Sequence, residues 1–200
     1  MALQLIALLL ALVSAMAGTS KGAPDGGKMD QSKVLIDFGD TDRHRWYVIN
    51  DGVMGGMSQS NIQRTDSGTG VFAGELSLAN NGGFASVRAV AGRHDLSGYA
   101  GLEVRVRGDG RTYELLLRTN DHFDGIAWRA RFDGGNGAWT TTRISFDEFI
   151  PTFRGRPLTN AARLDRKSIQ QIGFMLANKQ PGPFLLEIDS VRAWNSATID

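Results

Sequence analysis

Short segments in which apolar and polar residues alternate are the feature that most constrains how this chain can fold. The alternation is clear past residue 33, and it recurs in six segments: 34–38, 102–107, 113–118, 128–132, 172–176 and 184–188. Period two with one polar side is typical of antiparallel strands that are buried on one face. Many short strands separated by glycine-rich turns indicate a β-sandwich or a barrel. One such turn, at 108–110, predicts that 102–107 and 111–118 pair as a hairpin.

Helical content is expected to be small, so the predicted fold class is all-β with one or two short helices. Asp147 is expected to open one helical turn, which Pro151 would end. A second short helix is expected over 165–171, with Asp165 or Ser168 as its N-cap.

The N-terminal segment resembles an export signal. Residues 1–17 carry no charged side chain, 5–13 form a leucine- and alanine-rich run, and Ala15-Met16-Ala17 gives a small-x-small cleavage pattern. The run is shorter than the roughly 20 apolar residues that a spanning helix needs, so we expect no stable membrane span. The segment predicts a signal peptide cleaved after Ala17 and a periplasmic or secreted location.

The rest of the chain is expected to divide into a flexible linker at 18–33, one β-sandwich domain at 34–194 and a C-terminal tail at 195–200. The absence of cysteine excludes a disulfide framework and a thiolate metal site. The chain has 22 basic and 21 acidic residues, a net charge of +1, which gives no electrostatic argument for nucleic-acid binding.

Two glycine-rich polar segments, 50–56 and 80–84, stand out as candidates for function. Each carries a glycine pair, which usually marks a backbone shape that other residues cannot adopt, and each carries the Asn or Asp residues that stabilise turns. This composition suits a binding loop or a demanding structural corner, and the sequence leaves both open. Neither segment pairs a nucleophile with a base, and the three histidines lack metal-ligand spacing, so we predict no catalysis, no cofactor and no metal.

The candidate residues are therefore expected to contact a partner or ligand. They are Asn50, Asp51, Met54, Asn80, Asn81, Phe84, Arg118 and Arg154. A second candidate surface consists of arginines on the polar sides of the predicted strands: Arg105, Arg107, Arg118, Arg129, Arg131 and Arg143. If these strands neighbour each other in one sheet, the guanidinium groups would form a face suited to carboxylates, sugar acids or acidic partners; the alternative is an ordinary solvated face.

Several motifs in order resemble the complex I intermediate-associated protein 30 family. The motifs are Asn50-Asp51-Gly52-Val53-Met54-Gly55-Gly56, Phe72-x-Gly74, Asn80-Asn81-Gly82-Gly83-Phe84-x-Ser86-x-Arg88, Gly108-Asp109-Gly110, Phe153-Arg154-Gly155-Arg156, Ile172-Gly173-Phe174 and Gly182-Pro183-Phe184. The resemblance covers about 34–194 and implies a galactose-binding-like jelly-roll β-sandwich. It also implies a non-catalytic, chaperone-like role, because the mitochondrial member helps to assemble respiratory complex I. Predicted export would separate this chain from that assembly, so the role does not transfer directly.

The leading functional prediction is a non-catalytic, assembly-factor-like module that binds a protein partner through the glycine-rich segments. Asp51, Asn80 and Asn81 would supply polar contacts, and Met54 and Phe84 apolar anchors. The alternative is a jelly-roll carbohydrate-binding module, in which exposed aromatic rings stack on sugars. Its candidate platforms are Trp46, Tyr47, Trp128 and Trp139, although strand alternation places Trp128 on the inward side.

Overall fold

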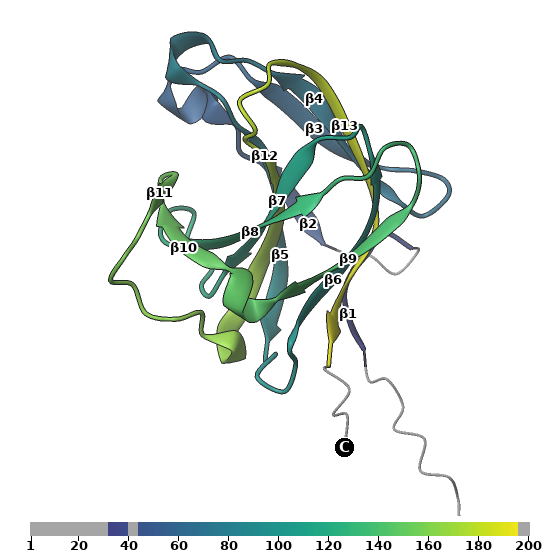
Figure 1. Ribbon diagram of the computed structural model, residues 1–200, viewed down its shortest axis with the longest axis vertical. Coiled ribbons are helices and arrows are strands. Elements are labelled where there is room, and N and C mark those ends of the chain that lie inside the picture. The colour runs from purple at the N-terminus through teal and green to yellow at the C-terminus, as the bar shows by residue number, and fades with distance from the viewer. Residues whose placement is uncertain (1–31, 40–43, 196–200) are drawn as a thin grey trace, which may run out of the picture.

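The computed structural model describes residues 32–39 and 44–195, which form two antiparallel sheets packed face to face (Figure 1). The predicted signal peptide, and nearly all of the predicted linker and tail, lie outside these residues. One sheet has the order β3-β4-β13-β6-β9, with β1 paired to β13. Its strands are β1 (Lys33–Asp37), β3 (Gln59–Arg64), β4 (Gly70–Leu76), β6 (Gly101–Gly108), β9 (Thr140–Ser145) and β13 (Gly182–Trp194).

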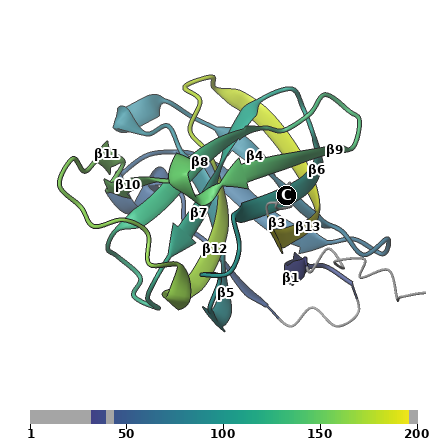
Figure 2. The same ribbon diagram turned by 60° about the horizontal axis from the view of Figure 1, so that its bottom comes forward.

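The second sheet has the order β11-β10-β8-β7-β12-β5-β2. Its strands are β2 (Arg45–Val48), β5 (Ala85–His94), β7 (Thr112–Arg118), β8 (Ala127–Asp133), β10 (Ile150–Phe153), β11 (Arg156–Pro157) and β12 (Ile169–Leu176). An end-on view separates β6 and β13 of the first sheet from β5 and β12 of the second (Figure 2). This arrangement confirms the predicted all-β sandwich.

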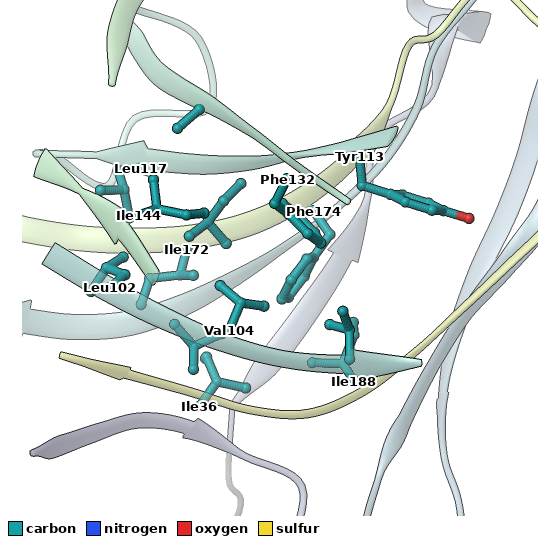
Figure 3. Close-up of a cluster of buried hydrophobic side chains, with 14 of the residues drawn as sticks. Ile36, Leu102, Val104, Tyr113, Leu117, Phe132, Ile144, Ile172, Phe174 and Ile188 are labelled. Carbon is teal, nitrogen blue, oxygen red and sulfur yellow. The ribbon is translucent and has the colours of Figure 1, made fainter. Parts of the chain in front are cut away.

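The core lies between the sheets and is built from the alternating apolar residues of both. In β6, Leu102, Val104 and Val106 are buried. From the facing sheet, the ring of Phe174 extends toward Val104 (Figure 3). Burying a side chain of this size contributes roughly 1.5–3 kcal/mol, so the inward alternation supplies the main stabilisation of the sandwich. Within the described residues no helix is long and apolar enough to cross a membrane.

The predicted hairpin of 102–107 with 111–118 is wrong, because β6 and β7 belong to different sheets. β6 pairs with β9 and β13, whereas β7 pairs with β8 and β12. The glycine-rich connection carries the chain from one sheet to the other, and Asp109 fixes it by accepting hydrogen bonds from the Tyr113 hydroxyl and the Leu185 N–H. Alternation in the sequence predicts which face of a strand is buried. It does not predict which other strand pairs with it.

Both predicted short helices are present as single 3-10 turns. The first, η3 (Phe146–Glu148), begins with a capping box formed by Ser145 and Glu148. The second, η4 (Arg166–Ser168), is capped by Asp165, which accepts a hydrogen bond from the Lys167 N–H. It ends three residues earlier than predicted, because Ile169 begins β12. Two further turns, η1 (Asp51–Met54) and η2 (Ala79–Asn81), lie in the two glycine-rich segments.

Candidate functional site

One buried carboxylate joins the two glycine-rich segments. Asp51 is 0% exposed, and its Oδ1 accepts a hydrogen bond from the Ser58 N–H at 2.9 Å. Its Oδ2 accepts from the Ser58 hydroxyl at 2.6 Å, from the Gly83 N–H at 2.6 Å and from the Phe84 N–H at 3.3 Å. Both oxygens are therefore occupied within the protein. The prediction that Asp51 contacts a partner is wrong, because its charge is used to hold two distant segments together.

The glycine pairs make this arrangement possible. A Cβ at Gly56 would lie 2.3 Å from Cγ of Asp51, and one at Gly82 would lie 2.6 Å from its Oδ2. Their neighbours Gly55 and Gly83 have φ values of 88° and 130°, a conformation that L side chains rarely adopt. Each pair thus contains one glycine that leaves room for the carboxylate and one that turns the backbone around it.

The asparagines of the two segments extend the same connection. The Asn50 Oδ1 accepts hydrogen bonds from the Ser60 hydroxyl at 2.7 Å and from the Ser86 N–H at 3.1 Å. Asn80 donates from Nδ2 to the Gly55 carbonyl at 3.1 Å. Asn80 and Asn81 both have left-handed φ values near 55–58°, which Asn tolerates better than most residues. Their side chains remain exposed, so a contact with a partner stays a prediction for these two residues.

The hydrogen bonds also determine the charge state of Asp51. Burial alone would raise the pKa of this carboxyl group, since a charge is poorly solvated inside a protein. The Ser58 hydroxyl and the backbone N–H groups of Gly83, Ser58 and Phe84 favour the carboxylate, and their sum lowers the pKa below its ordinary value. Asp51 is thus ionised at neutral pH, and hydrogen-bond donors of the surrounding loops stabilise its negative charge.

Several exposed apolar side chains lie on the two loops that contain or flank this buried group. Val53, Met54, Met57 and Leu78 are all exposed, with exposed fractions between 42% and 65%. We call these four residues the apolar tip. Phe84 is half-buried and is therefore less available than predicted. Scattered exposed apolar residues are normal, whereas four of them on two joined loops are a feature typical of contact surfaces.

Arg118 and Arg154 lie in a different region, beside the loop 119–126 on the outer face of the second sheet. Arg118 donates from Nη1 to the Gly125 carbonyl at 3.1 Å. Arg154 pairs with Asp124 at 2.7 Å, and its guanidinium lies over the Phe153 ring. The eight predicted residues thus form two separate groups.

The predicted guanidinium-rich face does not form as one surface. Arg105, Arg107 and Arg143 lie on the first sheet, whereas Arg118, Arg129 and Arg131 lie on the second. Five of the six form ion pairs with nearby carboxylates; the pairs are Arg105–Asp189, Arg107–Glu187, Arg143–Glu103, Arg129–Glu114 and Arg131–Glu114. Most of these charges are therefore balanced locally.

The prediction missed two residues on the outer face of the second sheet, Arg88 of β5 and Gln171 of β12. Arg88 is 8% exposed, and its Nη1 donates to the Gln171 Oε1 and to the Phe123 carbonyl, each at 3.1 Å. Gln171 donates from Nε2 to the carbonyls of Asn120 and His122. The sequence does contain one sign of this site, because Arg88 is a charged residue within a segment of apolar and small residues.

Two of the four candidate sugar platforms face the core. Trp46 stacks on Phe38, with ring centroids 5.4 Å apart, and Trp128 is buried in the core cluster, as its alternation predicted. Trp139 has the guanidinium groups of Arg105 and Arg107 over its ring. Tyr47 is exposed on the outer face of the second sheet. Within the residues described, no three His, Asp or Glu side chains gather as metal ligands would.

Comparison with known proteins places this architecture in a family. Residues 36–188 match the family described as complex I intermediate-associated protein 30. The Drosophila melanogaster protein named complex I intermediate-associated protein 30, mitochondrial, is 28% identical over 185 residues, which cover 80% of this chain and 62% of the relative. The mouse protein of the same name is 27% identical and covers 82% of this chain and 56% of the relative. The chain thus spans somewhat more than half the length of these two relatives.

Solved structures with the same architecture include a family 11 carbohydrate-binding module from Clostridium thermocellum, in complex with a β-1,3-1,4-mixed-linked tetrasaccharide. It aligns with a TM-score of 0.61 and 19% identity, covering 82% of this chain and 96% of the module. At this identity the likeness shows the fold alone, and it confirms the predicted jelly-roll sandwich.

The comparison overturns the predicted periplasmic or secreted location. The relatives from fly, mouse, Caenorhabditis elegans and Neurospora crassa are all named as mitochondrial proteins, and none of these names indicates export. The prediction depended on apolarity and small residues in 1–17, and those properties alone do not specify a destination. The match over residues 36–188 shows that the chain belongs to the complex I intermediate-associated protein 30 family.

Proposed function

We propose that this chain is a non-catalytic, chaperone-like assembly factor that binds a protein intermediate of complex I. The observation that carries the proposal is family membership over almost the whole sandwich, because the relatives are named for association with such an intermediate. The objection that an exported chain could not reach complex I assembly no longer applies. Because the chain spans only part of its relatives, the assembly role is a property to be tested for this sandwich by itself.

The apolar tip is the surface that we propose to contact the partner. Val53, Met54 and Met57 project from a segment that Asp51 and the glycine pairs hold in a defined shape. A rigid presentation lowers the entropic cost of binding, and methionine adapts its shape to different partner surfaces. Asn80 and Asn81, which stay exposed beside the tip, would supply polar contacts at its rim.

The test is capture of complex I subunits from a mitochondrial extract by the purified, tagged chain, quantified by mass spectrometry. Replacing Met54 and Met57 together by Ser should reduce capture by about tenfold or more, because contact residues of this kind carry much of an interface's energy. The matched control is Ile150→Ser, which removes an apolar side chain that is equally exposed on another face. The chain should fold in both cases. Equal capture by the two variants would exclude the tip, and no enrichment of complex I subunits by the wild-type chain would overturn the function.

A glycan array with the same protein separates this proposal from sugar binding. Carbohydrate-binding modules use exposed aromatic platforms, and Trp46 and Trp128 point into the core here. We expect no reproducible signal on the array. Binding to one sugar, without capture of complex I subunits, would contradict the assembly role.

A further inference from the structure

Two arginines on the outer face of the second sheet lack a direct ion pair with any carboxylate among the described residues. Arg88 lies on β5 and Arg118 on β7, the two strands that flank β12 in the second sheet (Figure 1). Within the described residues neither forms an ion pair, although every outward-facing arginine of β6, β8 and β9 does. Arg88 and Arg118 therefore differ from the other arginines on strand faces.

Both guanidinium groups are partly removed from water. Arg88 is 8% exposed, and burial together with the positive charge of Arg118 lowers the pKa of Arg88 to about 10. Burial also lowers the pKa of Arg118. The charge of Asp124 acts in the opposite direction on both groups, but this carboxylate is already paired with Arg154. Two like charges that share a poorly solvated site destabilise each other, and an anion placed between them would relieve this.

The surrounding residues hold the two arginines in place and leave donors free. The structure shows protein acceptors for Nη1 of each guanidinium, and these are carbonyl or amide oxygens: Phe123 and Gln171 for Arg88, and Gly125 for Arg118. Gln171 is itself anchored to the loop 119–126 through two carbonyls. Arginine has five N–H donors in a planar fork that matches a carboxylate or a phosphate. Further donors on both groups thus remain for a ligand.

An aromatic ring marks the edge of the same site. The Phe123 side chain is 67% exposed, and the Arg88 guanidinium lies 5.9 Å from the centroid of its ring. Stacking of this kind fixes the plane of a guanidinium, so that its outer edge is presented in one orientation. The ring also forms an apolar border beside the charged groups.

We propose that Arg88 and Arg118 form a binding site for an oxyanion, a carboxylate or phosphate group, on the outer face of the second sheet. The anion sits against both guanidinium groups, beside Phe123. The site is separate from the apolar tip and requires no protein partner. Its test can therefore fail or succeed independently of the assembly role.

The experiment follows the arginine Nε–Hε signals by NMR while the purified chain is titrated with inorganic phosphate and, separately, with citrate. Sodium chloride keeps the ionic strength constant. We expect the signals of Arg88 and Arg118 to shift in a saturable manner with at least one of the two anions. A response to phosphate alone, to citrate alone or to both supports the site and identifies the group that it takes. No saturable shift with either anion would overturn it.

Three variants test the assignment. Arg118→Gln should weaken the anion affinity by about tenfold or more, since a hydrogen bond to a charged group is worth ~1.5–3 kcal/mol. The anion affinity of Arg118→Lys should lie between those of Arg118→Gln and the wild type, because lysine keeps the positive charge and lacks the planar set of guanidinium donors. Arg131→Gln is the matched control, an 80% exposed arginine on the same face, and it should leave the affinity unchanged. Equal weakening by Arg131→Gln and Arg118→Gln would show general charge attraction and overturn the site.

Discussion

The glycine-rich end of the sandwich and the outer face of its second sheet each bury a charged side chain, and they compensate it differently. Asp51 receives four hydrogen bonds from its own chain, and the glycines around it leave room for the carboxylate. Arg88 has two neutral acceptors, a like charge beside it, and the opposite charge of Asp124, which is already paired with Arg154. The first arrangement is complete by itself and indicates a structural role. The second is incomplete by itself and indicates a role in binding.

The largest expected effect is that of removing the Asp51 carboxylate. Asp51→Ala leaves the N–H groups of Ser58, Gly83 and Phe84 without this acceptor. The Ser58 hydroxyl keeps only the Ser77 carbonyl, and the connection between the two glycine-rich segments is weakened. We expect a loss of about 3–5 kcal/mol in the free energy of unfolding, measured by urea denaturation. Asp121→Ala, which removes an exposed carboxylate from the loop 119–126, is the control and should change stability by less than about 0.5 kcal/mol. Similar stabilities for the two variants would contradict the structural role of Asp51.

The next largest effect tests whether the glycines serve the carboxylate. Gly56→Ala places a Cβ against Asp51 and should cost about 1–3 kcal/mol, as overpacking of a filled site does. In Gly52→Ala, in the same segment, the added Cβ has no other atom within 4 Å. The free energy of unfolding of this variant should stay within about 0.5 kcal/mol of the wild-type value. Denaturation of both variants gives the comparison.

A double-mutant cycle identifies the source of the Gly56 effect. In the Asp51→Ala background the added methyl group no longer meets the carboxylate, so Gly56→Ala should cost much less there. An undiminished cost in that background would mean that the backbone of the segment, and not Asp51, requires the glycine.

The pH dependence of stability should show a smaller effect of the same carboxylate. The pKa of Asp51 is lowered in the folded state, so the unfolded chain binds a proton more readily and stability rises with pH in this range. The contribution of Asp51 is fully present above its unfolded pKa of about 3.9 and is lost as pH falls through the folded value. Denaturation curves of wild type and Asp51→Asn, measured from neutral to acidic pH, should therefore converge as the pH falls. A constant difference would show that ionisation of Asp51 contributes nothing.

Strands with large inward residues could be predicted from the sequence, and strands without them could not. β6, β7 and β12 alternate large apolar residues that fill the core, so their pattern follows directly from burial. β3 contains a single large apolar residue, Ile62, and is held at the sheet edge by backbone pairing with β4. The strand β3 forms because β4 pairs with it, and the alternation of residues within β3 does not indicate that pairing. The same limit explains the wrong hairpin of β6 with β7.

The backbone of the two glycine-rich segments could be predicted from the sequence, and the role of Asp51 could not. The glycine pairs correctly marked two special backbone shapes, and the interpretation as a structural corner was open from the start. The role of Asp51 depends on Gly83, which is 32 positions away, so only the folded chain shows that its oxygens are occupied. Arg88 belongs to one of the motifs found in the sequence, but its burial goes with contacts to the distant loop 119–126, such as its hydrogen bond to the Phe123 carbonyl.

The smallest expected effect on stability is that of replacing Arg88 on the outer face of the second sheet. Arg88→Met replaces the buried guanidinium by an apolar side chain of similar reach and removes the repulsion from Arg118. It also leaves the Gln171 Oε1 and the Phe123 carbonyl without this donor, which offsets the gain. We expect the free energy of unfolding in urea to change by less than about 1 kcal/mol, because the relieved desolvation and repulsion of the charge offset the two lost hydrogen bonds. A loss as large as that of Asp51→Ala would show that Arg88 is a structural anchor, and the contrast between the two regions would fail.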